Sequence, residues 1–229
     1  MSVSIYDLPE EMRDIADANV ITVQRLRLDM EKNKDFDYIL SAIHKLGFPE
    51  KLEALIMKYI ITMSKKGHEL YYFLSGRGIN SDGKSISDIW EYSMQELEDK
   101  HDYIQWLFPT KEPSKYNPNV PVIKNLKEYQ TKNIRNHLLY SFLIMLDFFG
   151  LQKQKHKIVY ADNFMERKKV WLAPNNHNYL RITRILQSLV LFGMQNEAIQ
   201  FLDCLCNIYE DYPDCITKEG LQFWKNALK

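Results

Sequence analysis

Hydrophobic positions along this chain recur with helical spacing over most of its length. Apolar residues return every three or four positions, which places them on one face of an α-helix. This pattern predicts helices over residues 7–32, 35–46, 50–64, 85–107, 133–149, 179–192, 195–209 and 217–228. The alternating pattern of a β-strand is nearly absent. The sequence therefore predicts an all-α fold, a multi-helix globular bundle.

Two long connections interrupt the helical pattern. Four prolines keep residues 109–121 extended, because proline cannot continue a helix. Residues 151–177 form a polar, basic connection with a helical turn predicted near 164–172. The glycine-rich stretch 75–83 lacks the spacing of a dinucleotide-binding or Walker loop, so a turn at Asp82-Gly83 is expected there rather than a phosphate-cradling loop.

The helix pattern divides the chain into two parts. The first three predicted helices make an N-terminal helical extension over residues 1–69, and residues 70–229 form the main domain. The most apolar stretch, 138–151, is too short to span a bilayer. The N-terminus also lacks the basic and apolar regions of a secretory signal. We expect a cytoplasmic protein, or a nuclear one in a eukaryote, that is not secreted through a signal peptide.

Charge is balanced overall but not locally. The 229 residues include 30 Lys plus Arg and 30 Asp plus Glu, and 13% are aromatic, which excludes a disordered chain and a strongly basic nucleic-acid binder. Residues 151–184 hold eight Lys or Arg against two acids, whereas residues 195–219 hold six acids against one Lys. The basic segment could contact phosphate, RNA or an acidic partner. Because such runs are usually solvated faces, we expect no nucleic-acid partner.

The cysteines do not suggest a disulfide framework or a metal site. Cys204, Cys206 and Cys215 are odd in number and confined to the end of the chain. Cys-x-Cys spacing places two thiols on opposite sides of a helix, which is unsuited to zinc. We expect buried thiols, no metal and no cofactor.

His101 is the most informative polar residue. It lies on the apolar stripe of the helix predicted over 85–107, so we expect it to be at least partly buried and hydrogen-bonded. One interpretation is a structural histidine at the turn into the proline-rich stretch. The other is a general base or ligand-binding donor, with Asp102, Glu112 or His177 nearby. Candidate catalytic residues are therefore His101, Asp102 and His177.

A second candidate site lies at the start of the helix predicted near His177. Arg181 and Arg184 share a stripe with His177, and the helix N-terminus presents amide groups to an anion. Two guanidinium groups spaced three residues apart can bind a carboxylate or phosphate. Alternatively, both arginines pair with internal acids such as Asp102, Glu112 or Asp147. Asn176 is suited to capping the helix.

Aromatic residues close the helix that contains His101. Trp106 and Phe108 end the helix beside Pro109, with Tyr103 one turn earlier. Such residues usually anchor a loop to the core, and a peptide-binding aromatic groove is the alternative. The candidate ligand-binding residues of both sites are His101, Tyr103, Trp106, Glu112, Asn176, His177, Arg181 and Arg184.

Three motifs carry a family resemblance: Tyr72-Phe73 with Gly76, Gly78 and Asp82-Gly83, the block His101-Asp102-Tyr103-Ile104-Gln105-Trp106-Leu107-Phe108-Pro109, and the block Asn176-His177-Asn178-Tyr179-Leu180-Arg181-Ile182-Thr183-Arg184. With Met145–Leu151 between the last two, the chain strongly resembles the opioid growth factor receptor conserved domain over about residues 70–229. The animal receptor of that family is described as binding the pentapeptide Met-enkephalin and restraining cell growth. The resemblance supplies no catalytic residues.

Two functions follow as expectations. The first is a non-enzymatic interaction module that binds a peptide, a protein or a small anionic ligand between the His101 block and the helix start near His177. The second is an enzyme acting on a small anionic substrate, with a histidine acid/base and an arginine clamp.

Overall fold

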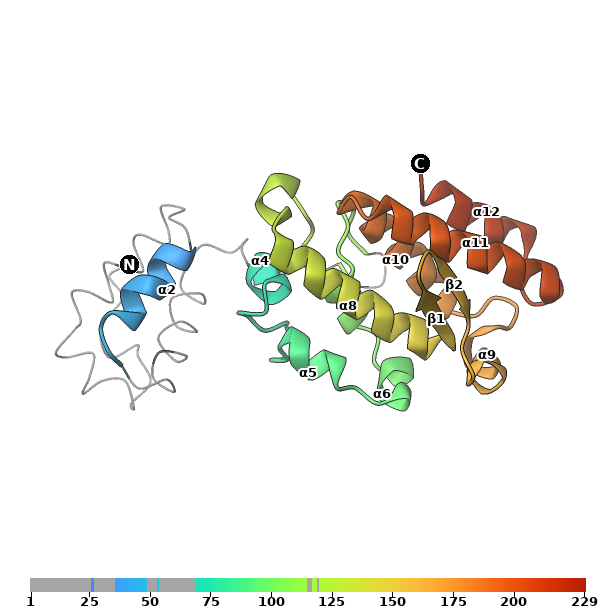
Figure 1. Cartoon of the computed structure of the whole chain (residues 1–229), viewed down its shortest axis with the longest axis horizontal. Coiled ribbons are helices and arrows are strands. Elements are labelled where there is room, and N and C mark those ends of the chain that lie inside the picture. Colours follow the sequence, from blue (N-terminus) through green and yellow to red (C-terminus); the bar gives the residue numbers. More distant parts are fainter. Residues whose placement is uncertain (1–25, 27–35, 49–52, 54–68, 115–116, 119) are drawn as a thin grey trace. The chain divides into compact units, whose positions relative to one another are not determined.

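The computed structural model describes residues 26, 36–48, 53, 69–114, 117–118 and 120–229 (Figure 1). The chain divides into two compact units, Met1–Glu69 and Leu70–Lys229. Helices predominate among the described residues, which also form one two-stranded sheet. The helical character predicted from the sequence is confirmed, and the sheet is the exception to an all-α fold.

The first unit is described around one helix, α2 (Phe36–His44). It lies within the helix predicted over 35–46, and it buries Ile39 and Ile43. His44 Nδ1 lies 3.2 Å from Glu53 Oε1. The helices predicted over 7–32 and 50–64 lie almost entirely outside the described residues.

In the second unit, the helix predicted over 85–107 is replaced by three short helices. They follow α4 (Glu69–Leu74) and are α5 (Ile86–Trp90), α6 (Met94–Asp99) and α7 (Tyr103–Leu107). The prediction of one continuous helix is therefore wrong. Ser93 accepts a hydrogen bond from Glu96 N while Glu96 accepts one from Ser93 N, so a capping box starts a new helix there.

The glycines of the first motif permit close packing. Gly76 has φ +78°, and a Cβ built on it would lie 2.8 Å from Cε1 of His137. A Cβ on Gly78 would lie 2.9 Å from the Cβ of Tyr72. The predicted turn at Asp82-Gly83 is confirmed: Gly83 has φ +73°, and its N–H donates to Asn80 O.

The long helix α8 (Lys132–Phe148) follows a short 3₁₀ helix at Leu126–Tyr129 and matches the helix predicted over 133–149. Its C-terminal carbonyls are bound by side chains from α9 (Phe164–Trp171). Arg167 Nε donates to Phe148 O at 2.8 Å, and Trp171 Nε1 donates to Phe149 O at 2.9 Å. These bonds satisfy acceptors that a helix end otherwise leaves unpaired.

The connection predicted over 151–177 contains more structure than a basic loop. Strand β1 (Leu151–Gln154) pairs antiparallel with β2 (Lys157–Tyr160), in a register that sets Gln154 opposite Lys157. Helix α9 then confirms the helical turn predicted near 164–172. The hairpin was missed because its turn lacks glycine: Lys155 takes φ +54° instead.

Three further helices complete the second unit: α10 (Asn178–Leu191), α11 (Gln195–Asp211) and α12 (Lys218–Asn226), as predicted. In Figure 1, α8 crosses this unit with α5 and α6 on one side and α11 and α12 on the other. Aromatic rings join α8 to α11, with Phe142 and Phe201 centroids 5.4 Å apart. No helix among the described residues has the length and apolar character needed to cross a membrane.

The basic and acidic segments noted in the sequence meet in the fold. Strand β2 packs on α11. Lys153 Nζ lies 3.3 Å from Glu197 Oε1, and the Tyr160 hydroxyl donates to Asp211. Part of the local charge imbalance is therefore neutralised inside the second unit.

Candidate functional site

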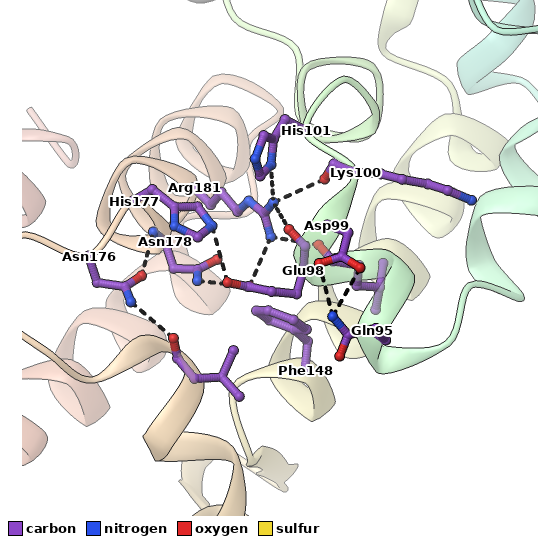
Figure 2. Close-up of polar contacts among 12 residues, drawn as sticks. Gln95, Glu98, Asp99, Lys100, His101, Phe148, Asn176, His177, Asn178 and Arg181 are labelled. Carbon is purple, nitrogen blue, oxygen red and sulfur yellow. Dashed lines mark hydrogen bonds and ion pairs between the residues drawn. The ribbon is translucent and has the colours of Figure 1, made fainter.

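Arg181 joins the two sequence blocks singled out as candidate sites. Its side chain is buried at 5% exposure and reaches from α10 to the end of α6 (Figure 2). Nη1 donates to Leu97 O at 2.6 Å, and Nη2 donates to Glu98 O and Lys100 O, both at 3.0 Å. A guanidinium offers five N–H donors in a planar fork, which suits several carbonyls at one helix end.

This contact explains where α6 ends. Lys100, the C-cap residue, has ψ 136°, so the backbone turns away from helical geometry there. The partial negative charge of a helix C-terminus attracts a cation, and Arg181 supplies one beneath the surface. The Arg181 side chain therefore fixes the path of the chain from α6 into the His101 block.

His101 is exposed, so the expectation that it is at least partly buried is wrong. The helical stripe ends with α6 at Asp99, and His101 falls in the connection to α7. Its Nδ1 lies 2.8 Å from Arg181 Nη2. Because a guanidinium only donates, Nδ1 accepts this bond, and Nε2 carries the proton of the neutral ring.

His177 stands beside His101 at the start of α10. The two rings meet edge to face, with centroids 5.3 Å apart. His177 Nε2 lies 3.4 Å from Glu98 Oε1, and its side chain is 46% exposed. Burial lowers the pKa of the His177 imidazole below its ordinary value; the Glu98 carboxylate opposes this change, while Arg181 and His101 add to it.

Asparagines shape the start of α10. Asn176 Oδ1 accepts from Asn178 N at 2.9 Å, and Asn176 Nδ2 donates to Val170 O at 2.9 Å. The capping role expected of Asn176 is thus present, although His177 occupies the N-cap position. Asn178 is fully buried, and its Nδ2 donates to Glu98 Oε2 at 3.1 Å.

Arg184 lies at a different helix end. Its Nη1 reaches Phe108 O and Thr110 Oγ1, each at 3.3 Å, beyond the last turn of α7. Burial lowers the pKa of its guanidinium. Arg181 and Arg184 share a helix stripe as predicted, but their side chains bind the ends of α6 and α7 separately. The structure does not bring them together on one anion.

The aromatic candidates are part of the core. Tyr103 and Trp106 are 2% and 4% exposed, which excludes them from an open groove. The Tyr103 hydroxyl donates to Leu97 O at 2.8 Å, and burial raises its pKa. Trp106 packs edge-on against Phe73, and its Nε1 has no hydrogen-bond partner among the described residues.

The two acidic candidates are exposed and lie away from the hydrogen bonds of His101. Asp102 Oδ1 accepts from Asn117 Nδ2 at 3.2 Å. Glu112 contributes only its backbone carbonyl, which accepts from Thr110 Oγ1 at 2.9 Å. Neither carboxylate forms a hydrogen bond or ion pair with His101, Arg181 or Arg184 within the described part of the chain.

Glu98 completes the junction and was not among the predicted site residues, nor was the bond that Asn178 donates to it. Glu98 Oε2 lies 3.8 Å from Arg181 Nη1 and also receives the Asn178 bond. The signal that points to Glu98 is the block at 176–181, whose polar residues on a core-facing helix require partners.

The described residues also show no side-chain cluster suited to a metal ion. Among the described residues, no three His, Cys, Asp or Glu side chains form a group that could hold a metal ion. The three cysteines are present as thiols, and burial raises the pKa of Cys204 to about 12.

Comparison with known proteins places the chain in a family. The opioid growth factor receptor (OGFr) conserved region matches residues 62–229. The chain is 34% identical over 134 residues to opioid growth factor receptor-like protein 1 of Xenopus tropicalis, covering 56% of this chain and 26% of that protein. It is 35% identical over 122 residues to the opioid growth factor receptor of Mus musculus, covering 50% and 19% respectively.

The human opioid growth factor receptor is 33% identical over 122 residues, which cover 50% of this chain and 18% of the receptor. The chain thus spans about a quarter or less of the length of these relatives. No solved structure matches it. Because the conserved region covers most of the sequence and includes both motif blocks that meet at Arg181, the chain belongs to the family of the opioid growth factor receptor conserved region.

Proposed function

We propose that this protein is a non-enzymatic interaction module that recognises a peptide or protein partner at the junction of α6 and α10. We define this junction surface by Glu98, His101 and His177. The supporting observation is the set of hydrogen bonds made by Arg181. Its buried guanidinium donates to internal acceptors, and its Nη2 also binds Nδ1 of the exposed His101 imidazole at 2.8 Å. The exposed groups are therefore positioned in advance, which reduces the ordering cost of binding.

The chemistry of the junction surface favours a peptide over a small anion. The neutral His101 ring offers an N–H donor at Nε2, and the half-buried Glu98 carboxylate, which already accepts from Asn178, has lone pairs left to accept a further bond. A peptide backbone supplies both the acceptors and the donors that complement these groups. An anion would have to displace carbonyls from Arg181, and it would meet the exposed carboxylates of Asp99 and Asp102.

The enzymatic alternative requires two arginines that bind one substrate anion, and Arg181 and Arg184 are not placed to do so. The guanidinium groups of Arg181 and Arg184 bind separate helix ends. No serine, threonine or cysteine side chain hydrogen-bonds to His101 or His177 within the described residues. A general base without a positioned nucleophile or substrate clamp gives no basis for a reaction.

The names of the relatives supply the first probe. Two of them are called opioid growth factor receptors. The receptor of the family that this chain resembles is described as binding Met-enkephalin, so this pentapeptide is the first ligand to test. Because the chain covers a small share of those proteins, a broader probe is also needed. A phage-displayed library of random peptides, selected on the full chain, provides it.

The experiment compares the wild-type chain with a His101→Ala/His177→Ala variant. Both imidazoles are exposed, so we expect the variant to keep its fold, as checked by its melting temperature. If the double variant unfolds, His177→Ala alone takes its place. Isothermal titration with Met-enkephalin and with the selected peptides should give affinities at least about tenfold weaker for the variant. Equal binding of every probe to both proteins, or no enrichment on the wild type, would overturn the proposal.

A further inference from the structure

A second surface, built from different residues, lies where α5 meets α8. Trp90 packs edge to face against Tyr140, with centroids 4.7 Å apart, and against His137 at 5.2 Å. Tyr140 is 52% exposed, and Leu143, one turn further along α8, is 39% exposed. We call these four residues the Trp90–Tyr140 face.

The rings of this face are held in place from beneath. Trp90 Nε1 donates to Ser141 Oγ at 2.8 Å, and Ser141 is fully buried. His137 Nδ1 lies 2.8 Å from Leu74 O, so it donates its proton there. Rigid tryptophan and tyrosine side chains with satisfied polar atoms are typical of the residues that dominate binding energy in interfaces.

Carboxylates border the face. Glu91 follows Trp90 directly and is exposed, with no hydrogen-bond or ion-pair partner in the described part of the chain. Asp147 is one helical turn beyond Leu143 on α8, and its Oδ1 lies 3.4 Å from Asn163 Nδ2. The wider segment 82–99 holds six acids and one lysine.

The position of these acids makes binding of a cation from a partner more favourable. Glu91 is the C-cap residue of α5, and Asp147 lies in the last turn of α8. A helix C-terminus carries partial negative charge, so it disfavours a carboxylate. A lysine or arginine from outside would neutralise such a carboxylate and would also be attracted to the faces of the Trp90 and Tyr140 rings.

We propose that the Trp90–Tyr140 face docks a basic peptide segment in which lysine or arginine flanks an apolar anchor. The apolar anchor packs on Leu143 and Tyr140. The flanking cations meet the aromatic rings and the carboxylates of Glu91 and Asp147. Charge complementarity selects this partner over an acidic peptide.

The test uses the full chain and a synthetic peptide of about 12 residues that alternates leucine with arginine, together with a matched peptide in which glutamate replaces arginine. Fluorescence anisotropy should show binding of the arginine peptide that weakens with salt, and no binding of the glutamate peptide. Glu91→Lys should weaken binding about tenfold without lowering the melting temperature. Tyr140→Ala should weaken it as well. The His101→Ala/His177→Ala variant should bind normally, which separates this proposal from the junction surface.

Three results would overturn the proposal. The first is equal binding of both peptides, and the second is an affinity unchanged in both Glu91→Lys and Tyr140→Ala. The third is a dimer in sedimentation velocity that Tyr140→Ala dissociates, because the face would then belong to a second copy of the chain. If Tyr140→Ala lowers the melting temperature, Tyr140→Phe replaces it, since the phenyl ring keeps the contact with Trp90, and Glu91→Lys then decides the outcome.

Discussion

Arg181 Nη2 donates to His101 Nδ1 at 2.8 Å, although the two residues are 80 positions apart in the chain. The same nitrogen also donates to the carbonyls of Glu98 and Lys100. One buried side chain therefore ends a helix and orients an exposed imidazole. This arrangement gives Arg181 a structural role, and in the function that we propose the groups that it positions make the contacts with a partner.

Replacing Arg181 should destabilise the second unit. In Arg181→Ala, the carbonyls of Glu98 and Lys100 lose the Arg181 donor and that of Leu97 keeps only the Tyr103 hydroxyl, which we expect to cost about 3 kcal/mol. Urea unfolding followed by tryptophan fluorescence measures this, because all four tryptophans lie after residue 70. Arg135→Ala, at an exposed position of α8, is the matched control and should change stability by less than about 0.5 kcal/mol. Equal effects of the two substitutions would contradict the capping role.

A pair of glycines separates steric crowding from backbone strain. Gly76 and Gly83 both have positive φ, so alanine should cost about 1 kcal/mol at either position. Only at Gly76 would the added Cβ meet another side chain, Cε1 of His137 at 2.8 Å. We expect Gly76→Ala to lower the free energy of unfolding by about 1–3 kcal/mol more than Gly83→Ala. Chemical denaturation of both variants checks this, and a smaller loss at Gly76 would argue against the close contact.

Acid should weaken the fold through His177. Its folded pKa is lowered by burial, so the folded state binds fewer protons than the unfolded state near that pKa. The contribution is complete above the unfolded pKa of about 6.5 and declines as the pH falls below it. Melting temperatures between pH 7.5 and 5.5 should therefore drop less for His177→Gln than for the wild type. His156→Gln, at the exposed hairpin turn, serves as the control and should follow the wild-type curve.

The capping box at Ser93 should contribute measurably to the break between α5 and α6. Ser93→Ala removes the acceptor for Glu96 N, a change that typically costs about 1 kcal/mol. Ser81→Ala, at an exposed loop position, should have little effect. Equilibrium unfolding compares the two. A neutral Ser93→Ala would contradict this role of the capping box at the start of α6.

The sequence predicted the long helices better than the short ones. For α8, α10 and α11, apolar periodicity and end signals agree, so the predicted ranges hold within a few residues. Between 85 and 107 the periodicity continued across helix boundaries, and the Ser93–Glu96 capping box was the overlooked local signal. The β-hairpin was missed because its strands have four residues each and its turn has no glycine.

The candidate site was predicted in part. The two blocks contact each other through His101, His177 and Arg181, as expected for a site between them. The direction of each guanidinium could not be predicted, because its acceptors are main-chain carbonyls that any residue type provides. Glu98 was overlooked for a related reason: its partners come from α10, about 80 residues later.

The role that we assign to Arg181 is that of a buried scaffold and not of an anion clamp. The most direct measurement is an NMR titration of the full chain with inorganic phosphate, following the Nη signals of Arg181. We expect separate Nη resonances, because the carbonyls of α6 slow the rotation of the guanidinium, and we expect phosphate to leave them unchanged. A saturable shift of those resonances on addition of phosphate would contradict the scaffold role.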